Sequence, residues 1–201
     1  MGFNSKVLAE SLGRIARSIE MRADELNALD AKIGDGDLGV TLTRCARGIL
    51  EILPRLPEDI GMVFMSCVQA ITKVSGASFA TLLATSFMGV AKATKGRSEV
   101  PWEEVSDLLG IARDAMMARG KAALGEKTVI DAVEAARLAT VGLDDPGAIL
   151  DAAIKVVNEV IDRMRNQPNQ AGRARIWSEK SIGLDDPGMV AFRLMLESLR
   201  V

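Results

Sequence analysis

The chain has 201 residues, a net charge of −2 and a hydrophobic share of 48%. This length suits one domain over residues 1–201 with a substantial core, and the balanced charge argues against a nucleic-acid partner. No apolar run reaches the roughly 18 residues of a membrane span, and nothing at the start resembles a signal peptide. We therefore expect a cytoplasmic protein with no membrane partner.

The hydrophobic spacing predicts helices along nearly the whole chain and no convincing strand. The first helix is expected from about Ser5 to the aspartate-rich stretch near residue 30, and the second ends before Pro54. Six more are expected at about 60–71, 76–95, 101–116, 129–136, 145–161 and 186–199. Eight helices with mostly short connections predict an all-α, up-and-down arrangement.

Residue types that are rare or missing also limit the chemistry. The chain has no histidine, which excludes a histidine base, a phosphohistidine and a histidine-ligated zinc within it. Chemistry here must use carboxylates, a metal, backbone amides and cationic side chains. Cys45 and Cys67 both fall on apolar helical faces, which favours reduced core residues over a disulfide.

The stretch 29–39 is the richest in chemical groups. It places Asp30, Asp35 and Asp37 within eight residues and separates them with glycines. Two unit charges about 4 Å apart repel by roughly 4 kcal/mol at an effective dielectric of 20, and a bound cation would remove that cost. Magnesium takes a few carboxylates and leaves its other positions to water and phosphates. We favour a magnesium site over a solvated Asp-Gly turn.

In an up-and-down bundle, alternate connections share one end. The aspartate stretch, the loop 75–78, the loop 120–128 and the loop 172–188 should therefore meet. Two nearly identical strings, 141–147 and 182–188, each carry an Asp-Pro helix start. The alternation places the first copy at the opposite end, as a structural element, and the second at the candidate site.

The converging loops contain groups that bind anions. Helices that begin near Ala77 and Pro187 would point free N–H groups at this end, and Arg173 and Lys121 could neutralise phosphate oxygens. Gly120 and Gly125 have the spacing of a P-loop, but Glu126 intervenes before Lys127 and no strand precedes them. We reject that motif, and leave open whether Lys127 contacts a ligand or belongs to a plain helix–helix connection.

With these motifs in view, the sequence resembles the nucleotide-binding L subunit (DhaL) of bacterial dihydroxyacetone kinases. The resemblance covers essentially the whole chain, through five motifs in the same order: 29–37, 76–78, 119–128, 172–174 and 180–188. It implies eight antiparallel helices closed into a barrel, with ADP or ATP at one end. The sequence departs from the family pattern at Leu38, where His or Cys is usual, at Thr41, at Phe79 and over 175–178.

The resemblance also implies roles for individual residues. Asp30, Asp35 and Asp37 would hold two Mg²⁺ ions, and with Arg173 would form the catalytic group. The residues implied to line the nucleotide are Leu38, Gly39, Thr41, Ala77, Ser78, Gly120, Val129, Arg173, Asp186, Pro187 and Gly188.

Two functions remain open from the sequence. The leading hypothesis is a kinase subunit that transfers phosphate from Mg-ATP, or from bound nucleotide recharged by a phosphoenolpyruvate-dependent phosphotransferase protein, to a small ketose. The resemblance implies that a histidine of a separate K subunit holds that ketose covalently. The alternative is a non-catalytic nucleotide-binding regulator that acts through protein partners. A helical scaffold without nucleotide is disfavoured by the three intact carboxylates.

Overall fold

The structure is a computed structural model that describes residues 2–200. These residues form nine α-helices, two three-residue strands and four short 3₁₀ turns, so the predicted all-α class is confirmed. The helices are α1 (Ser5–Met21), α2 (Ala23–Ile33), α3 (Leu38–Ile52), α4 (Ile60–Val74), α5 (Ser78–Ala93), α6 (Val105–Gly120), α7 (Val129–Ala139), α8 (Pro146–Met164) and α9 (Pro187–Glu197).

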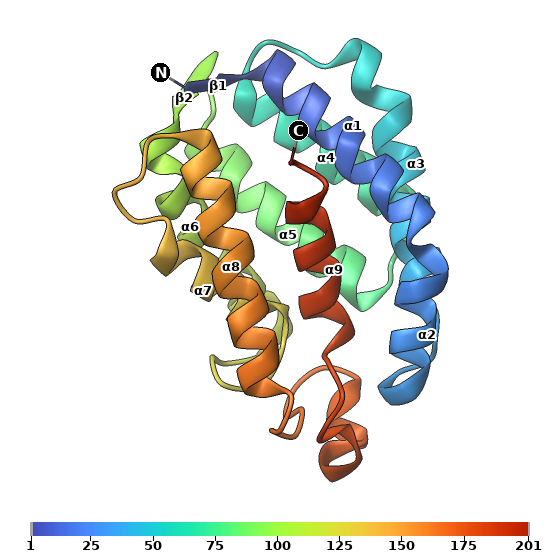
Figure 1. The fold of residues 1–201 in the computed structure, drawn as a ribbon. Coiled ribbons are helices and arrows are strands. Elements are labelled where there is room, and N and C mark those ends of the chain that lie inside the picture. The colour runs from blue at the N-terminus through green and yellow to red at the C-terminus, as the bar shows by residue number, and fades with distance from the viewer. Residues whose placement is uncertain (1, 201) are drawn as a thin grey trace.

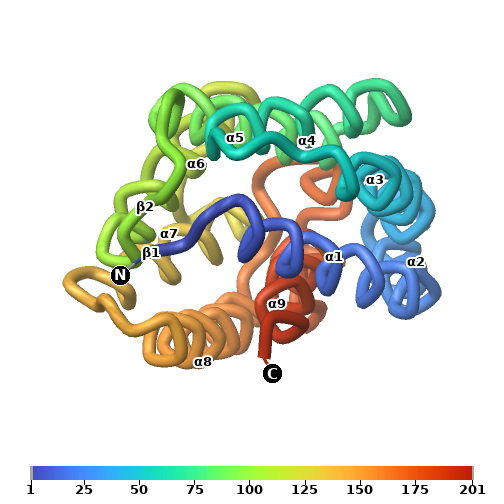
Figure 2. The backbone as a smooth tube through the Cα atoms, turned by 90° about the horizontal axis from the view of Figure 1, so that it is seen from above, coloured from blue at the N-terminus to red at the C-terminus, as the bar shows by residue number. Residues whose placement is uncertain are grey.

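The helices pack in a closed circuit. Each of α3 to α8 contacts the next helix along the chain, and α1 closes the circuit by packing on both α3 and α9 (Figures 1 and 2). One buried cluster, with Leu42, Val157 and Met189, lies among α1 to α3 and α7 to α9. A second buried cluster, with Cys67 and Ile71, is formed by residues of the four helices α1, α3, α4 and α5. The amphipathic faces predicted from the sequence therefore point inwards around the circuit.

The first predicted helix is in fact two helices, which raises the expected count of eight to nine. The break falls at Arg22, where ψ is 9° instead of helical. The Arg22 N–H still donates to Ser18 and Ile19 carbonyls, and its guanidinium pairs with Glu25 in the first turn of α2. After this change of direction α2 packs on both α3 and α9, and it carries Asp30 towards the loop before α3.

Pro101 was expected to open a helix, and this prediction is wrong. Strand β2 (Glu99–Pro101) pairs antiparallel with β1 (Gly2–Asn4), with Pro101 opposite Gly2. A 3₁₀ turn follows, and α6 begins only at Val105. Strands this short are too brief to show alternation in the sequence. Buried Phe3 and Val100 pack with Ile60 and tie the start of the chain to the end of the bundle opposite the aspartate loop.

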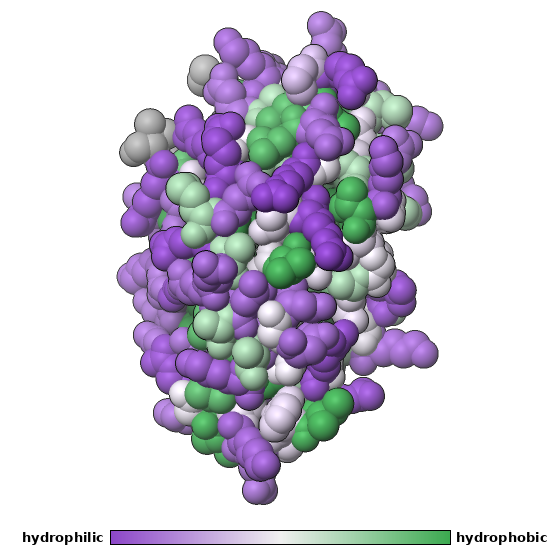
Figure 3. All heavy atoms as spheres, turned by 90° about the vertical axis from the view of Figure 1, so that its right-hand side faces the viewer, coloured by the Kyte–Doolittle hydropathy of each residue, from purple (hydrophilic) through white to green (hydrophobic). Residues whose placement is uncertain are grey.

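Both cysteines are buried and unpaired with each other, as predicted. Burial raises the pKa of the Cys45 thiol to about 11 and that of Cys67 to about 12. On the face seen in Figure 3, hydrophobic side chains stand in small groups between hydrophilic ones. Among the described residues, none of the helices is both long enough and apolar enough to cross a membrane.

Candidate functional site

A pocket of about 390 Å³ opens at the end of the bundle where the aspartate loop lies. The alternation of helix directions predicted that four connections would meet at this end, and each of them contributes to the pocket wall. The lining includes residues from each connection: six between Asp30 and Thr41, six between Gly76 and Leu82, six between Arg119 and Ile130, and the segments 171–174 and 186–188. The turns at the opposite end, including the first Asp-Pro-Gly copy, do not line this pocket.

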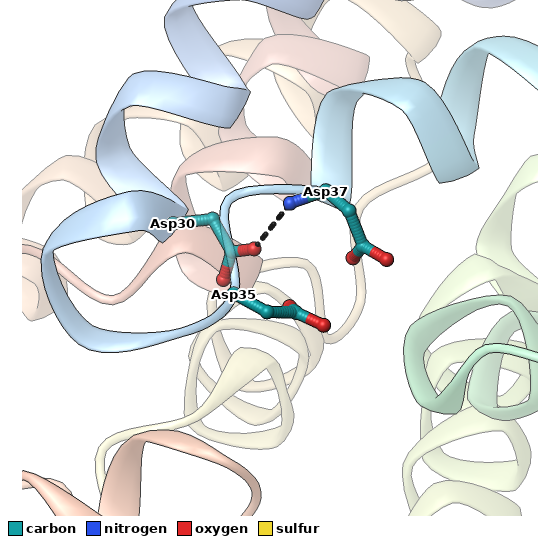
Figure 4. A group of neighbouring side chains, drawn as sticks. All are labelled: Asp30, Asp35 and Asp37. Carbon is teal, nitrogen blue, oxygen red and sulfur yellow. Dashed lines mark hydrogen bonds between the residues drawn. The ribbon is translucent and has the colours of Figure 1, made fainter.

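The three aspartates converge at the pocket wall. One carboxylate oxygen from each of Asp30, Asp35 and Asp37 lies within 4.8 Å of the other two, and all three side chains gather around the turn between α2 and α3 (Figure 4). Asp30 is held in place because its Oδ2 accepts hydrogen bonds from the backbone N–H groups of Asp37, at 3.0 Å, and Leu38, at 3.3 Å. Asp35 and Asp37 are exposed to solvent.

This donor set fits a hard divalent cation. All the donors are carboxylate oxygens, which magnesium prefers at about 2.1 Å. Oxygens on opposite sides of such an ion lie about 4.2 Å apart, so three oxygens that already lie within 4.8 Å of one another need only small side-chain rotations to share an ion. The exposed Asp35 and Asp37 have room for those rotations, whereas the Asp30 carboxylate is anchored by its two N–H partners.

The pocket also holds an uncapped helix start. No side chain caps the N-terminus of α5, so the N–H groups of its first turn, from Ser78 onwards, are available to an anion, whereas the Ala77 N–H donates to the Ser75 hydroxyl at 3.2 Å. By contrast, Thr128 caps α7 through a reciprocal capping box with Asp131, and Asp186 caps α9 by accepting from the Met189 N–H at 2.9 Å. Of the two helix starts named as anion sites from sequence, α5 has the freer donors.

The cations at the pocket differ in part from those expected. Arg173 lines the pocket and forms an ion pair with Asp35, so it lies beside the acidic cluster. Lys121 does not line the pocket; it follows α6 in a left-handed conformation, with φ of 51°. Because α6 continues through Gly120, Arg119 lies at the pocket wall instead. Arg119 is the first residue of the 119–128 motif, and the sequence predicted no role for it.

Lys127 has a structural role, which settles the question left open from sequence. Its side chain is 1% exposed, and its ammonium donates to the carbonyl oxygens of Arg165, Gln167 and Ser181 at 3.2, 2.8 and 2.9 Å. Burial lowers the pKa of Lys127, an effect that the carboxylates of Asp186 and Asp185 oppose. Lys127 lies behind the pocket wall and is not among the lining residues.

The two Asp-Pro-Gly copies differ in their surroundings. Asp145 is exposed and caps α8 by accepting from the Ala148 N–H at 2.8 Å. Asp186 is buried, lines the pocket and accepts a further bond, at 2.9 Å, from the side-chain amide of Asn169. Burial raises the pKa of Asp186 to about 6, although its hydrogen bonds act in the opposite direction.

All the residues implied to line a nucleotide do line this pocket, except Gly39. A Cβ on Gly39 would collide with the Ala23 carbonyl oxygen and would lie 2.8 Å from the Asn27 side chain. Gly39 therefore allows α2 and α3 to approach closely. Phe79 also lines the pocket, with its ring 3.0 Å from where a Gly188 Cβ would stand.

The fold and the pocket define the class: a closed circuit of antiparallel helices with an acidic cluster and an open helix start at one end. The sequence profile of the DAK2 domain matches residues 32–200. The chain therefore belongs to the DAK2 domain family.

Particular relatives agree with this family. The chain is 27% identical to the PEP-dependent dihydroxyacetone kinase, ADP-binding subunit DhaL of Escherichia coli, over 99% of this chain and 97% of that protein. It is 31% identical to the triokinase/FMN cyclase of Homo sapiens over 98% of this chain, but spans only 35% of that protein. The crystal structure of the dihydroxyacetone kinase from C. freundii in complex with AMP-PNP and Mg²⁺ superposes with a TM-score of 0.77 at 26% identity, covering 99% of this chain and 34% of that one.

Proposed function

We propose that residues 1–201 form one nucleotide-binding domain that holds ADP or ATP with two Mg²⁺ ions and transfers phosphate to a small ketose held by a partner subunit. The observation that carries this proposal is the convergence of three carboxylates within 4.8 Å at the wall of a pocket that also holds an uncapped helix start. A cation site beside an anion site is the arrangement that a metal–phosphate ligand requires.

The size and lining of the pocket support a nucleotide. Its volume of about 390 Å³ falls within the range of small-molecule sites. The pocket wall also has an apolar part, formed by Ile33, Leu38, Phe79, Leu82, Val129 and Ile130. Such a wall suits a nucleobase, whereas the aspartates, the α5 amides and the arginines suit its phosphates.

The chain's own residues have separable tasks in this proposal. Asp30, Asp35 and Asp37 would hold the metal, which when bound neutralises phosphate charge and orients the phosphoryl group. The N–H groups at the start of α5 would bind phosphate oxygens. Arg173, now paired with Asp35, would supply positive charge to the transferred group. Catalysis would thus rest on positioning and charge stabilisation.

A partner subunit is proposed because the chain has no histidine to hold a ketose. Exposed apolar side chains on the pocket-end loops support a protein contact there, since such side chains gain by being covered. Leu124 is 45% exposed, Ile176 79% and Ile182 46%. The E. coli relative is named as a subunit of a kinase, and we extend that assembly to this chain as part of the proposal.

The test is phosphate transfer from Mg-ATP to dihydroxyacetone by the chain mixed with a K-type partner from the same cell. We expect transfer with the parent chain and none with Asp37→Asn, which lacks one proposed metal ligand. Absence of transfer by a parent chain that still binds Mg-ADP would overturn the kinase assignment and favour a nucleotide-binding regulator.

A further inference from the structure

Lys127 is a buried cation that the proposed chemistry does not use. It sits in the connection before α7 with a left-handed backbone, φ being 60°, a conformation uncommon for a residue with a Cβ. Its three ammonium donors each have a carbonyl acceptor, on Arg165, Gln167 and Ser181. A charge is stable in a protein interior only when it is satisfied in this way.

The three acceptors belong to the two ends of one loop. Arg165 and Gln167 follow α8, and Ser181 precedes α9, so a single ammonium joins the start and the end of the segment 165–186. The backbone reinforces this closure, because the Gly183 N–H donates to the Arg165 carbonyl at 2.8 Å. Lys127 thus lies at the base of the loop.

Asn169 connects the base of the loop to the N-terminal ends of α7 and α9. Its side-chain amide donates to the Lys127 carbonyl at 2.7 Å and to the Asp186 carboxylate at 2.9 Å. Its backbone N–H donates to the Ser181 hydroxyl at 2.8 Å. All three side chains, those of Asn169, Lys127 and Ser181, are at most 1% exposed, so solvent does not compete for these bonds.

The part of the 165–186 loop that lies beyond its closed base contributes to the pocket wall. Its segment 171–174 lines the wall, and Arg173 reaches across to Asp35 on the acidic loop. Between the base and this segment, the loop has a backbone bond from the Gln170 N–H to the Glu126 carbonyl. The position of Arg173 therefore depends on how firmly the base is closed.

We propose that Lys127 is a positioning residue that closes the base of the 165–186 loop and thereby holds Arg173 at the nucleotide pocket. The proposal rests on the proposed function for its ligand, Mg-ADP. It assigns Lys127 neither phosphate contact nor nucleophilic chemistry, because an ammonium donating to three carbonyls has no lone pair to offer.

The first arm of the test is amide hydrogen exchange on the full chain without ligand. In the parent, the amides of Asn169, Gln170 and Gly183 should be strongly protected although they lie outside the helices. Lys127→Met keeps an unbranched stem and removes the donors, and should cut that protection at least about tenfold while α4 and α5 exchange as in the parent. Lys155→Met, on the exposed face of α8, is the matched control and should change neither.

The second arm measures Mg-ADP affinity in a double-mutant cycle with Arg173→Gln. If Lys127 acts by placing Arg173, each single variant weakens binding about tenfold or more, and the double variant binds about as weakly as Lys127→Met alone. Fully additive losses, or unchanged loop protection in Lys127→Met, would overturn the proposal.

The two arms separate the possible failures. Rapid exchange of the three loop amides in the parent would refute the closure without any variant, even if Lys127→Met fails to fold. A parent that shows the protection but does not bind Mg-ADP would refute the proposed nucleotide function and the positioning role that rests on it, while leaving the closed loop base established.

Discussion

The two helix-capping aspartates, Asp145 and Asp186, offer a matched pair of perturbations. Each accepts a backbone N–H in the first turn of its helix, at 2.8 Å in α8 and 2.9 Å in α9. Asp145 is exposed at the end away from the pocket, and Asp186 is buried at the pocket wall. Replacement of each by alanine therefore removes the same local bond in two different settings.

For Asp145→Ala the expected cost is that of a lost N-cap, about 1 kcal/mol. In a chain of this size that lowers Tm by about 2–4 °C. Because Asp145 lies at the far end from the pocket, Mg-ADP affinity should not change.

For Asp186→Ala two opposing effects must be compared. The variant loses a cap of about 1 kcal/mol and a bond to the buried Asn169 amide of about 1–2 kcal/mol. It also removes a carboxylate whose pKa burial has raised from 3.8 to about 6, which at neutral pH is a cost of about 3 kcal/mol. The net change in stability at pH 7 should therefore be close to zero.

The sign of the pH dependence follows from the raised pKa. Below pH 3.8 Asp186 is protonated in both folded and unfolded chains, and above pH 6 it is charged in both. Between these values the folded chain binds the proton more tightly, so its stability falls as pH rises. Asp186→Ala lacks this fall, and so should be destabilised by about 2–3 kcal/mol near pH 4 and hardly at all at pH 7.

Urea denaturation at pH 4 and pH 7, with calorimetric titration of Mg-ADP at pH 7, measures both consequences. Asp186→Ala should weaken nucleotide binding and Asp145→Ala should not. Equal effects of the two variants on affinity would refute the placement of the copies at opposite ends. A stability change in Asp186→Ala that is the same at both pH values would refute the cost assigned to the buried carboxylate.

Three further predictions test other parts of the structure. Gly39→Ala should destabilise the chain by about 3 kcal/mol or more, since its Cβ collides with the Ala23 carbonyl. The control Gly76→Ala, with no atom within 4 Å of the added carbon, should barely change Tm. Equal melting temperatures of the two variants would contradict the close approach of α2 and α3. Cys45 and Cys67 should resist alkylation at pH 8 in the native chain and react in urea, because burial raises both thiol pKa values; fast native labelling would contradict this. The chain alone should not phosphorylate free dihydroxyacetone with Mg-ATP, because it has no histidine and Lys127 is held by three carbonyls; product formed without a partner would refute the two-subunit proposal.

The features that the sequence predicted correctly depend on local or periodic signals. Helix faces follow from hydrophobic spacing, and the Asp145 and Asp186 caps follow from an Asp-Pro pair that works within one turn. The gathering of four loops at one end follows from counting alternate connections. The aspartate loop is recognisable because Asp30, Asp35 and Asp37 are close in sequence as well as in space.

The features that were missed depend on contacts between distant segments. The pairing of Gly2 with Pro101 joins residues about a hundred positions apart, and no local pattern announces it. Lys121 and Lys127 look equally suited to phosphate in the sequence, but one follows α6 outside the pocket wall and the other is buried under a loop 38 to 54 residues further along. Side-chain direction in irregular loops is set by such packing, so sequence alone could not choose Arg119 over Lys121.

We propose that the acidic loop binds a nucleotide through a divalent metal, and calorimetry measures this binding and its metal dependence. Calorimetric titration of the parent, Asp35→Asn and Asp37→Asn with ADP should be performed with magnesium and with chelator. We predict saturable binding by the parent only with magnesium, and loss of that binding in both variants while their helicity and Tm stay close to the parent, since each variant also relieves carboxylate repulsion. Binding of Mg-ADP by either variant as tightly as by the parent, or equal binding with chelator, would contradict the account.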